Sequence, residues 1–431
     1  MSKYQQRYKE LLSTPEEFAL QISSGDRIWC GAGPTTATEM CNAIADRYEE
    51  LEDVTLVNML TFHPLKVLTS SKYQGHINYH SLFFGGIEHK FAKESNIIVN
   101  SLHLSNVFDV LRDVYKVNTV MTQCSPMDDE GYFHLGVMAT FVAGQLVDAG
   151  VPKRVFLQVN KHQCFTEGVH NKIHISQVTG LYEHNMPLAE LPQPPVTDVD
   201  NKIASYIIPM VPDGACLQVG LGGLANAVAY GLKDKKNLSC QTEMFTDSMM
   251  ELAKQGVMTG NMEASFALGS SDLYEFCGNN VKFAPINMTN NYERVGAQEN
   301  FISINACLMV DLTGQVCSES IGHRQYSCTG GQLDFVRGAR KSKGGKSFLC
   351  LPSTVTNKDG SVSSRINVNL PAGAVITTPR TDTMYVVTEY GVADLFGRSI
   401  PERVNEIIAI AHPDFRDELR TGAIEAGLIK E

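Results

Sequence analysis

The stretch 215–247, ACLQVGLGGLANAVAYGLKDKKNLSCQTEMFTD, decides how the rest of the chain is interpreted. It begins with an apolar run, Cys216–Val219, which is short enough for a buried strand. Gly220–Gly223 follows, and the next run, Ala225–Tyr230, is typical of a helix. Glycines let the backbone approach a ligand closely, and free N–H groups at the start of a helix bind anions. The stretch therefore predicts a strand, an anion-binding turn and a helix.

Glu243 is the candidate reactive residue of this stretch, because the chain extends again before it. Ligands of open α/β sheets bind where the strands end, and we expect Glu243 late in a strand near the glycine turn. Our hypothesis is that Glu243 is a nucleophile and that the turn holds the thioester it attacks. A dinucleotide site is the competing interpretation, with Gly220-x-Gly222-x-x-Ala225 as a loose fingerprint and Glu243 on a ribose. A surface acid beside a purely structural turn is the third.

Composition limits the class of protein. A chain of 431 residues with 43% hydrophobic and 19% charged residues indicates two or three globular domains. The net charge of −11 argues against nucleic acid as a partner, although a local pocket can still attract a small anion. The 11 cysteines form no CxxC pair, which favours a reducing compartment without disulfides and argues against a metal site.

No apolar run approaches the ~20 residues of a membrane span, and no signal peptide is visible. We therefore expect a cytoplasmic protein without a membrane partner.

Strands and helices alternate along the chain, which predicts an α/β fold of mostly parallel sheets. The proline-rich residues 188–200 are expected to link an N-terminal domain, 1–187, to a C-terminal domain, 201–431, that carries Glu243.

The two halves share a pattern. Gly31 and Gly33 match Gly220 and Gly222 at one constant offset, and each pair follows an apolar run and precedes a helix. This indicates a duplicated domain, although any two strand-to-helix turns resemble one another.

Further candidates follow in the second half. Residues 328–332 form a second glycine turn before a helix-like run, Leu333–Arg340. Gly345-Lys346-Ser347 suggests a phosphate-binding loop, but the required preceding glycine is Arg340. Ala374–Thr377 and Met384–Thr388 read as strands, the second ending at Glu389. Two carboxylates at strand ends can orient one another or raise a pKa, or they can be unrelated surface acids.

Several motifs resemble the acetyl-CoA hydrolase/transferase family, and within it the 4-hydroxybutyrate coenzyme A-transferases. The likeness covers nearly the whole chain and is more specific in the second half. The motifs are Gly220–Gly223, Thr242-Glu243-Met244, Ala264–Gly269, Gly330–Ala339 and Thr388–Leu395. One departure is the segment Lys161–Thr166 after Asn160, where the family usually has a Met-Pro-Arg-Thr-like sequence; this leaves the acid substrate open.

The resemblance implies two CoA-transferase-like (NagB/RpiA-like) α/β domains with the site between them. It implies that Glu243 becomes a glutamyl-CoA thioester, that Asn305 lies close to it, and that coenzyme A is the substrate carrier, without a metal or a nucleotide cofactor. Glu389 is kept as a further catalytic candidate. The residues expected at the coenzyme are Gly220, Leu221, Gly222, Gly223, Leu224, Gly330, Gly331 and Lys346. Expected partners are an acyl-CoA, short carboxylic acids and further copies of the chain, in a homodimer or larger homo-oligomer.

The chemistry suits a glutamate. Its reference pKa of about 4.3 makes it a carboxylate at neutral pH, so it needs no general base to attack a thioester. We expect exchange between an acyl-CoA and a carboxylate, with acetate and either butyrate or 4-hydroxybutyrate as the acids. The open alternatives are a thioester hydrolase that uses the same glutamate, an oxidoreductase built on the Gly220 turn, and a sensor that binds without catalysis.

Overall fold

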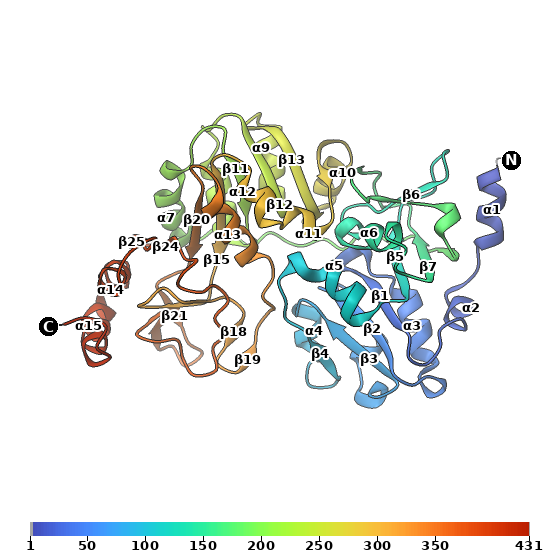
Figure 1. Cartoon of the computed structure of the whole chain (residues 1–431), viewed down its shortest axis with the longest axis horizontal. Coiled ribbons are helices and arrows are strands. Elements are labelled where there is room, and N and C mark those ends of the chain that lie inside the picture. The colour runs from blue at the N-terminus through green and yellow to red at the C-terminus, as the bar shows by residue number, and fades with distance from the viewer. Residues whose placement is uncertain (1–2, 431) are drawn as a thin grey trace. The chain divides into compact units, whose positions relative to one another are not determined.

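The computed structural model describes residues 3–430 and divides the chain into two units (Figure 1). The first unit holds Met1–Pro192 and Glu263–Thr289, and the second holds Gln193–Met262 and Asn290–Glu431. The main boundary falls inside the expected linker 188–200. Residues 263–289 differ from the expectation, since the sequence placed them in the C-terminal domain. They join the first unit because the end of β13 (Met258–Ala267) pairs with β14 (Lys282–Phe283), and β14 pairs with β8 (Glu167–Gly168).

A seven-stranded sheet forms the centre of the first unit, in the order β10-β7-β5-β1-β2-β3-β4. Every pair in it is parallel, as the alternation of strands and helices predicts. Its strands are β1 (Arg27–Ala32), β2 (Val54–Met59), β3 (Ile77–Ser81), β4 (Ile97–Val99), β5 (Thr119–Cys124), β7 (Arg154–Val159) and β10 (Gly180–Glu183). The other elements are β6 (Tyr132–His134), β9 (Lys172–His174), α1 (Lys3–Leu11), α2 (Pro15–Ala19), α3 (Thr38–Asp46), α4 (Gly86–Phe91), α5 (Val107–Asp109), α6 (Ala143–Asp148), α10 (Ser271–Asn280) and α11 (Ile286–Thr289).

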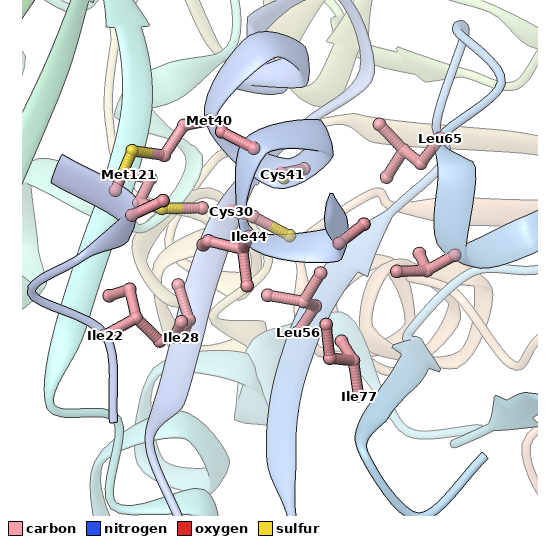
Figure 2. Packing of buried hydrophobic residues seen from close by; sticks show 14 of the residues in the cluster. Ile22, Ile28, Cys30, Met40, Cys41, Ile44, Leu56, Leu65, Ile77 and Met121 are labelled. Carbon is pink, nitrogen blue, oxygen red and sulfur yellow. The ribbon is translucent and has the colours of Figure 1, made fainter. Parts of the chain in front are cut away.

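One hydrophobic core of this unit lies between the sheet and α3. Figure 2 shows Met40, Cys41 and Ile44 of α3 packed with Cys30 of β1 and Leu56 of β2. Spacings of three and four residues put Met40, Cys41 and Ile44 on one face of the helix. All 11 cysteines are free, and those in this core pack as small hydrophobic side chains.

The second unit has a comparable sheet, ordered β25-β24-β20-β15-β11-β12-β13. Its strands besides β13 are β11 (Cys216–Val219), β12 (Leu238–Phe245), β15 (Phe301–Ala306), β20 (Lys346–Cys350), β24 (Tyr385–Thr388) and the antiparallel β25 (Gly391–Asp394). The helices are α7 (Asp198–Ile207), α8 (Gly223–Gly231), α9 (Asp247–Lys254), α12 (Tyr292–Gly296), α13 (Gln332–Lys341), α14 (Ile400–Ala409) and α15 (Arg416–Glu425). Three small sheets use β16 (Met309–Asp311), β17 (Val316–Cys317), β18 (Ser320–Ile321), β19 (Arg324–Gln325), β21 (Thr354–Thr356), β22 (Val362–Ser364) and β23 (Ile366–Asn367).

The strand order supports the duplication. Numbered along the chain, the seven strands of the first sheet run 7-6-5-1-2-3-4, and β11–β15, β20 and β24 follow the same order. In this correspondence β1 matches β11, and the turn at Gly31 matches the turn at Gly220. A shared order of seven strands is much harder to obtain by chance than a shared pair of glycines.

Two local expectations need correction or comment. Ala374–Thr377 forms no strand, and the chain there is irregular. Within residues 3–430, no helix combines the length and the hydropathy that a membrane span requires.

Candidate active site

The site of the second unit begins where the strand order reverses. From β11 the chain continues to β12 and β13 on one side, and it returns to β15 on the other. Such a switch point opens a crevice at the carboxyl ends of the strands. Gly220 follows β11 there, and its N–H donates to the carbonyl of Ile304 at 2.9 Å. The glycine turn 220–223 is therefore fixed at the point where an α/β sheet offers a binding site.

Two glycines in this turn are required by the geometry. Gly222 precedes α8 with φ 119° and ψ 179°, a conformation that only glycine adopts readily. A side chain on Gly223 would meet the carbonyl oxygen of Pro195 and the carboxylate of Asp200, each at 2.8 Å. Leu221 between them is 45% exposed, so the start of α8 lies under an open turn. A helix N-terminus can bind an anionic group, and at α8 the Asp200 carboxylate already lies beside the first residue.

Glu243 lies late in β12, as the sequence predicts, and is partly buried. Its Oε2 accepts a hydrogen bond from Nδ2 of Asn290 at 3.0 Å. Gly331 lies so close that a Cβ on it would overlap both the Glu243 carboxylate and the Asn290 amide. The next residue, Gln332, begins α13, so the carboxylate sits at the start of a 10-residue helix. The glycine turn 328–331 is thus brought to Glu243.

The pKa of Glu243 differs from the sequence expectation. Burial raises it to about 7, the hydrogen bond from Asn290 opposes this rise, and the negative charge of Asp334 adds to it. Asp334 is buried in the first turn of α13, with its Oδ2 at 3.5 Å from Nδ2 of Asn290. Glu243 is therefore only partly ionised at neutral pH, whereas a solvated glutamate would be fully ionised.

Sequence reasoning missed Asn290 and gave Asp334 no role. Asn290 belongs to no motif, and it reaches Glu243 from 47 positions along the chain. Asp334 lies within the quoted Gly330–Ala339 motif, four residues after Gly330. Asp334 lies in the first turn of the helix that follows the second glycine turn. That position could have indicated from the sequence that Asp334 lies near the site.

Asn305 ends β15 beside Gly220. Its amide exchanges two hydrogen bonds with the amide of Gln218, at 3.0 and 3.1 Å, and also donates to Ser303 Oγ at 2.9 Å. These bonds fix its orientation. β15 lies two strands from β12, or about 10 Å, so Asn305 borders the same crevice without bonding to Glu243.

Glu389 is not brought to Glu243. It follows β24, four strands from β12, which corresponds to about 19 Å across the sheet. Its two carboxylate oxygens accept from the N–H and Oγ of Ser353, at 2.8 and 2.6 Å. The hypothesis that these two carboxylates orient one another is wrong for this unit, because Glu389 instead holds the loop after β20.

Lys346 also lies elsewhere. It is the first residue of β20 and pairs with Ile302, whereas Asn305 pairs with Leu349 at the other end of the strand. Lys346 is therefore at the amino-terminal edge of the sheet, and the glycine turns and Glu243 are at the carboxyl-terminal edge. The structure does not bring it to the group expected around the coenzyme.

The matching turn of the first unit is buried and hydrogen-bonded to side-chain amides. Thr36, in the turn after β1, is buried, and its carbonyl accepts from Gln123 Nε2 at 3.0 Å. Asn160 donates to Gln123 Oε1 at 3.1 Å, and Asn58 donates to the Gly31 carbonyl at 2.9 Å. The two turns differ in exposure, since Leu221 in the second unit is 45% exposed whereas Thr36 in the first is fully buried.

The second unit thus presents a carboxylate of raised pKa, two glycine turns at helix starts and an amide donor at one sheet edge. A carboxylate beside hydrogen-bond donors at the end of a sheet is a candidate for acid, base or nucleophilic chemistry. In the described part of the chain, no cluster of three or more His, Cys, Asp or Glu side chains is arranged to hold a metal ion.

Comparisons with known proteins identify the class. Residues 1–192 match the acetyl-CoA hydrolase/transferase N-terminal domain, and residues 269–423 match the C-terminal domain of the same family. The chain is similar to butyryl-CoA:acetate CoA-transferase of Anaerostipes caccae, with 38% identity over 98% of both chains. It is also similar to 4-hydroxybutyrate coenzyme A transferase of Clostridium kluyveri, with 35% identity over 97% of this chain and 98% of the relative. The crystal structure of RipA from Yersinia pestis aligns with a TM-score of 0.90 and 33% identity, over 99% of this chain and all of RipA.

The chain therefore belongs to the acetyl-CoA hydrolase/transferase family, which confirms the resemblance found in the sequence. The expected fold class is confirmed as well, since both units are built on largely parallel sheets. The expectation of a CoA-transferring enzyme agrees with the names of the relatives that match over the full chain.

Proposed function

We propose that the protein is a CoA-transferase that moves coenzyme A between an acyl-CoA and a short-chain carboxylate, through a glutamyl-CoA thioester on Glu243. The observation that carries the proposal is the surroundings of the Glu243 carboxylate. It lies at the start of α13, against Gly331 and the amide of Asn290. In this proposal the coenzyme binds along Gly220–Leu224, and Gly330 and Gly331 face the reacting carbonyl.

The proposed reaction starts with attack of ionised Glu243 on the thioester carbonyl. The carbon–sulfur bond breaks, giving a mixed anhydride and the CoA thiolate. The thiolate then attacks the glutamyl carbonyl, so that the first carboxylic acid leaves as its carboxylate and a thioester remains on the enzyme. An incoming carboxylate repeats the two steps in reverse order and leaves as the new acyl-CoA. The thioester bond is conserved throughout, so the exchange needs no ATP.

Each tetrahedral intermediate carries an oxyanion, and donors at the start of α13 are placed to meet it. Backbone N–H groups that follow Gly331 point out of the first turn of the helix, and the Asn290 amide lies beside them. A donor of this kind typically stabilises an oxyanion by about 2.7–4 kcal/mol. The raised pKa of Glu243 also contributes, because a more basic carboxylate is a stronger nucleophile once it is ionised.

We propose acetate as one acid and butyrate or 4-hydroxybutyrate as the other. The support comes from the relatives, whose names give butyryl-CoA with acetate and 4-hydroxybutyrate. The family name also includes hydrolysis, so a thioester hydrolase that uses Glu243 is the second candidate. A transferase consumes the acyl-CoA only when a second carboxylate is present, whereas a hydrolase needs none.

The test combines exchange with trapping. Purified protein is incubated with butyryl-CoA, with and without acetate, and acetyl-CoA is followed by chromatography. Borohydride is then added to reduce any enzyme thioester, and mass spectrometry locates the modified residue. We expect acetate-dependent acetyl-CoA and modification at Glu243. Glu243→Ala should abolish both, and Glu243→Asp should cost about a hundredfold, since the shorter side chain withdraws the nucleophile by roughly 1 Å.

Glu251→Gln on α9 is the matched control, because it removes a surface glutamate that is 44% exposed. It should retain full exchange. Trapping at another residue, or normal exchange by Glu243→Ala, would refute the mechanism. Turnover of butyryl-CoA that ignores acetate would favour the hydrolase.

A further inference from the structure

A basic hollow lies in the second unit, where α12 packs against α13. Figure 1 labels both helices. Its volume is about 450 Å³, and it is lined by Tyr292, Arg337, Arg340 and Lys341. Ligand pockets for small molecules usually measure about 300–1,000 Å³. The hollow is therefore large enough for a small ligand, and the proposed mechanism does not use any of its lining residues.

One buried carboxylate, that of Asp382, forms ion pairs with both Arg337 and Arg340. Asp382 is 5% exposed, and its carboxylate lies 3.3 Å from Arg337 Nη2 and 3.5 Å from Arg340 Nη1. Arg340 Nη1 also donates to the carbonyl of Thr381 at 3.2 Å. These contacts use one nitrogen of each guanidinium, and each guanidinium has five N–H donors. Both side chains keep donors for a ligand, and they are 47% and 40% exposed.

The local charge is positive on an acidic protein. Arg337, Arg340 and Lys341 bring three positive charges, and their partners Asp382 and Glu293 bring two negative ones. The chain as a whole carries −11. Forked guanidinium donors at two adjacent positions suit the oxygens of a phosphate group better than a single carboxylate does.

Tyr292 adds an aromatic surface at the same hollow. It is 51% exposed, and the ammonium of Lys341 lies 5.6 Å from the centre of its ring. An exposed aromatic ring beside three cations offers stacking or edge contact to a planar group and charge to a phosphate. Nucleotides combine both features in one molecule.

We propose that the hollow formed by Tyr292, Arg337, Arg340 and Lys341 binds a nucleotide, with its phosphate groups on the two arginines and its base beside Tyr292. The nucleotide has two possible sources with the same chemistry, a free nucleotide or the nucleotide end of coenzyme A. Arg340 lies nine residues after Gly331, which is about 14 Å along α13. Binding at this hollow can be measured without turnover, so it does not depend on the proposed function.

A purely structural explanation also exists for these cations. Arg340 and Lys341 lie in the last turn of α13, where positive charge stabilises the end of a helix. That explanation predicts lower stability when the arginines are removed, and it predicts no ligand. The two explanations therefore differ in a direct binding measurement.

The experiment measures binding of adenosine 3′,5′-bisphosphate, ADP and inorganic pyrophosphate to the full chain by isothermal titration calorimetry at two salt concentrations. Arg340→Ala should weaken binding of both nucleotides at least about tenfold, the effect of losing a charged hydrogen bond. Tyr292→Ala should weaken the nucleotides and leave pyrophosphate unchanged. Lys343→Ala is the matched control, because Lys343 is a nearby cation that is 84% exposed, pairs with Glu299 and does not line the hollow. It should change binding less than twofold.

Two further measurements show whether the ligand is a free nucleotide or coenzyme A, and whether each variant is folded. If coenzyme A displaces the bound nucleotide, and Arg340→Ala raises KM for acyl-CoA at constant kcat, the ligand is the nucleotide end of the coenzyme. If coenzyme A does not displace it, the ligand is a separate nucleotide. Melting curves check that each variant folds, and Glu243→Ala should bind nucleotide normally even if exchange is never detected. Absence of nucleotide binding by the wild-type chain, or equal weakening by Lys343→Ala, would overturn the proposal.

Discussion

At the scale of single residues, burial is the largest influence on the ionisation of Glu243, and two side chains modify it in opposite directions. The amide of Asn290 donates to Oε2 and favours the charged form, whereas the charge of Asp334 disfavours it. Asp334 adds to the effect of burial, and the pKa lies at about 7. In the proposed mechanism, the reactivity of Glu243 therefore changes strongly within the neutral pH range.

The pH dependence of exchange tests this balance. Only the ionised carboxylate attacks, so kcat/KM for acyl-CoA should rise with pH to a plateau, with its midpoint near pH 7. At pH 6 the rate should be about a tenth of the plateau. Asn290→Ala removes the stabilising donor and should move the midpoint up by about 1–2 units, because a hydrogen bond to a charged group contributes about 1.5–3 kcal/mol. Asp334→Asn removes the repelling charge and should move the midpoint down.

The measurement is decisive because Asn290→Ala and Asp334→Asn should shift the midpoint of the pH profile in opposite directions. Asn357→Ala and Asp359→Asn change the same residue types in an exposed turn between β21 and β22, and they should leave the midpoint where it is. If Asn290→Ala and Asp334→Asn shift the midpoint in the same direction, the balance described for Glu243 is incorrect.

The sequence singles out Glu243 as the candidate reactive residue but does not show the ionisation state of its carboxyl group. Thr242-Glu243-Met244 belongs to a motif, and a strand end after a glycine turn is a readable signal. The pKa depends on Asn290, which comes from a segment 47 positions away and carries no motif. The same limit explains the error over Glu389: a strand end was correctly expected, but only the sheet order shows that three strands lie between β24 and β12.

At the scale of elements, the site depends on the close contact between the start of α13 and the end of β12. Gly331 is the contact between them, and its missing side chain leaves the space that the Glu243 carboxylate and the Asn290 amide occupy. The glycine pattern makes this turn predictable as a turn, and the helix after it was expected. The strands of two or three residues between positions 316 and 367 were not, because segments of that length show no usable periodicity.

Gly331→Ala tests this contact. The added methyl group would overlap Glu243, so the carboxylate must move away from the reacting position. A displacement of about 1 Å can cost a hundredfold in rate, and we expect a loss of at least that size in kcat with the fold retained. Steady-state kinetics and circular dichroism check the two parts. Gly86→Ala is the control, because a Cβ there meets nothing within 4 Å, and its activity should equal that of the wild type. Near-normal exchange by Gly331→Ala would show that Glu243 does not react from the position described.

At the scale of the whole molecule, the chain is a duplicated fold whose halves are not separate in sequence. Both sheets share one strand order. Residues 263–289 nevertheless belong to the first unit, although the segments before and after them belong to the second. The main boundary, between Pro192 and Gln193, lies in the proline-rich region 188–200. Nothing in the sequence marks the point where the chain passes back to the first unit, between Met262 and Glu263. This point lies inside β13, a continuous strand of 10 residues.

The unit boundaries predict how fragments fold. A fragment of residues 1–192 lacks β14, so β8 loses its parallel neighbour in the first unit. It also lacks Phe266, which packs against Phe141, and it exposes apolar surface that the full unit buries. A second fragment, in which residues 263–289 are joined to 1–192 by a flexible linker, restores these partners. We expect the second fragment to melt cooperatively at a higher temperature and the first to melt broadly or to aggregate, as calorimetry and near-ultraviolet circular dichroism would show. Identical melting of the two fragments would mean that residues 263–289 contribute nothing to the first unit, because burial of Phe266 alone should stabilise the joined fragment by about 1.5–3 kcal/mol.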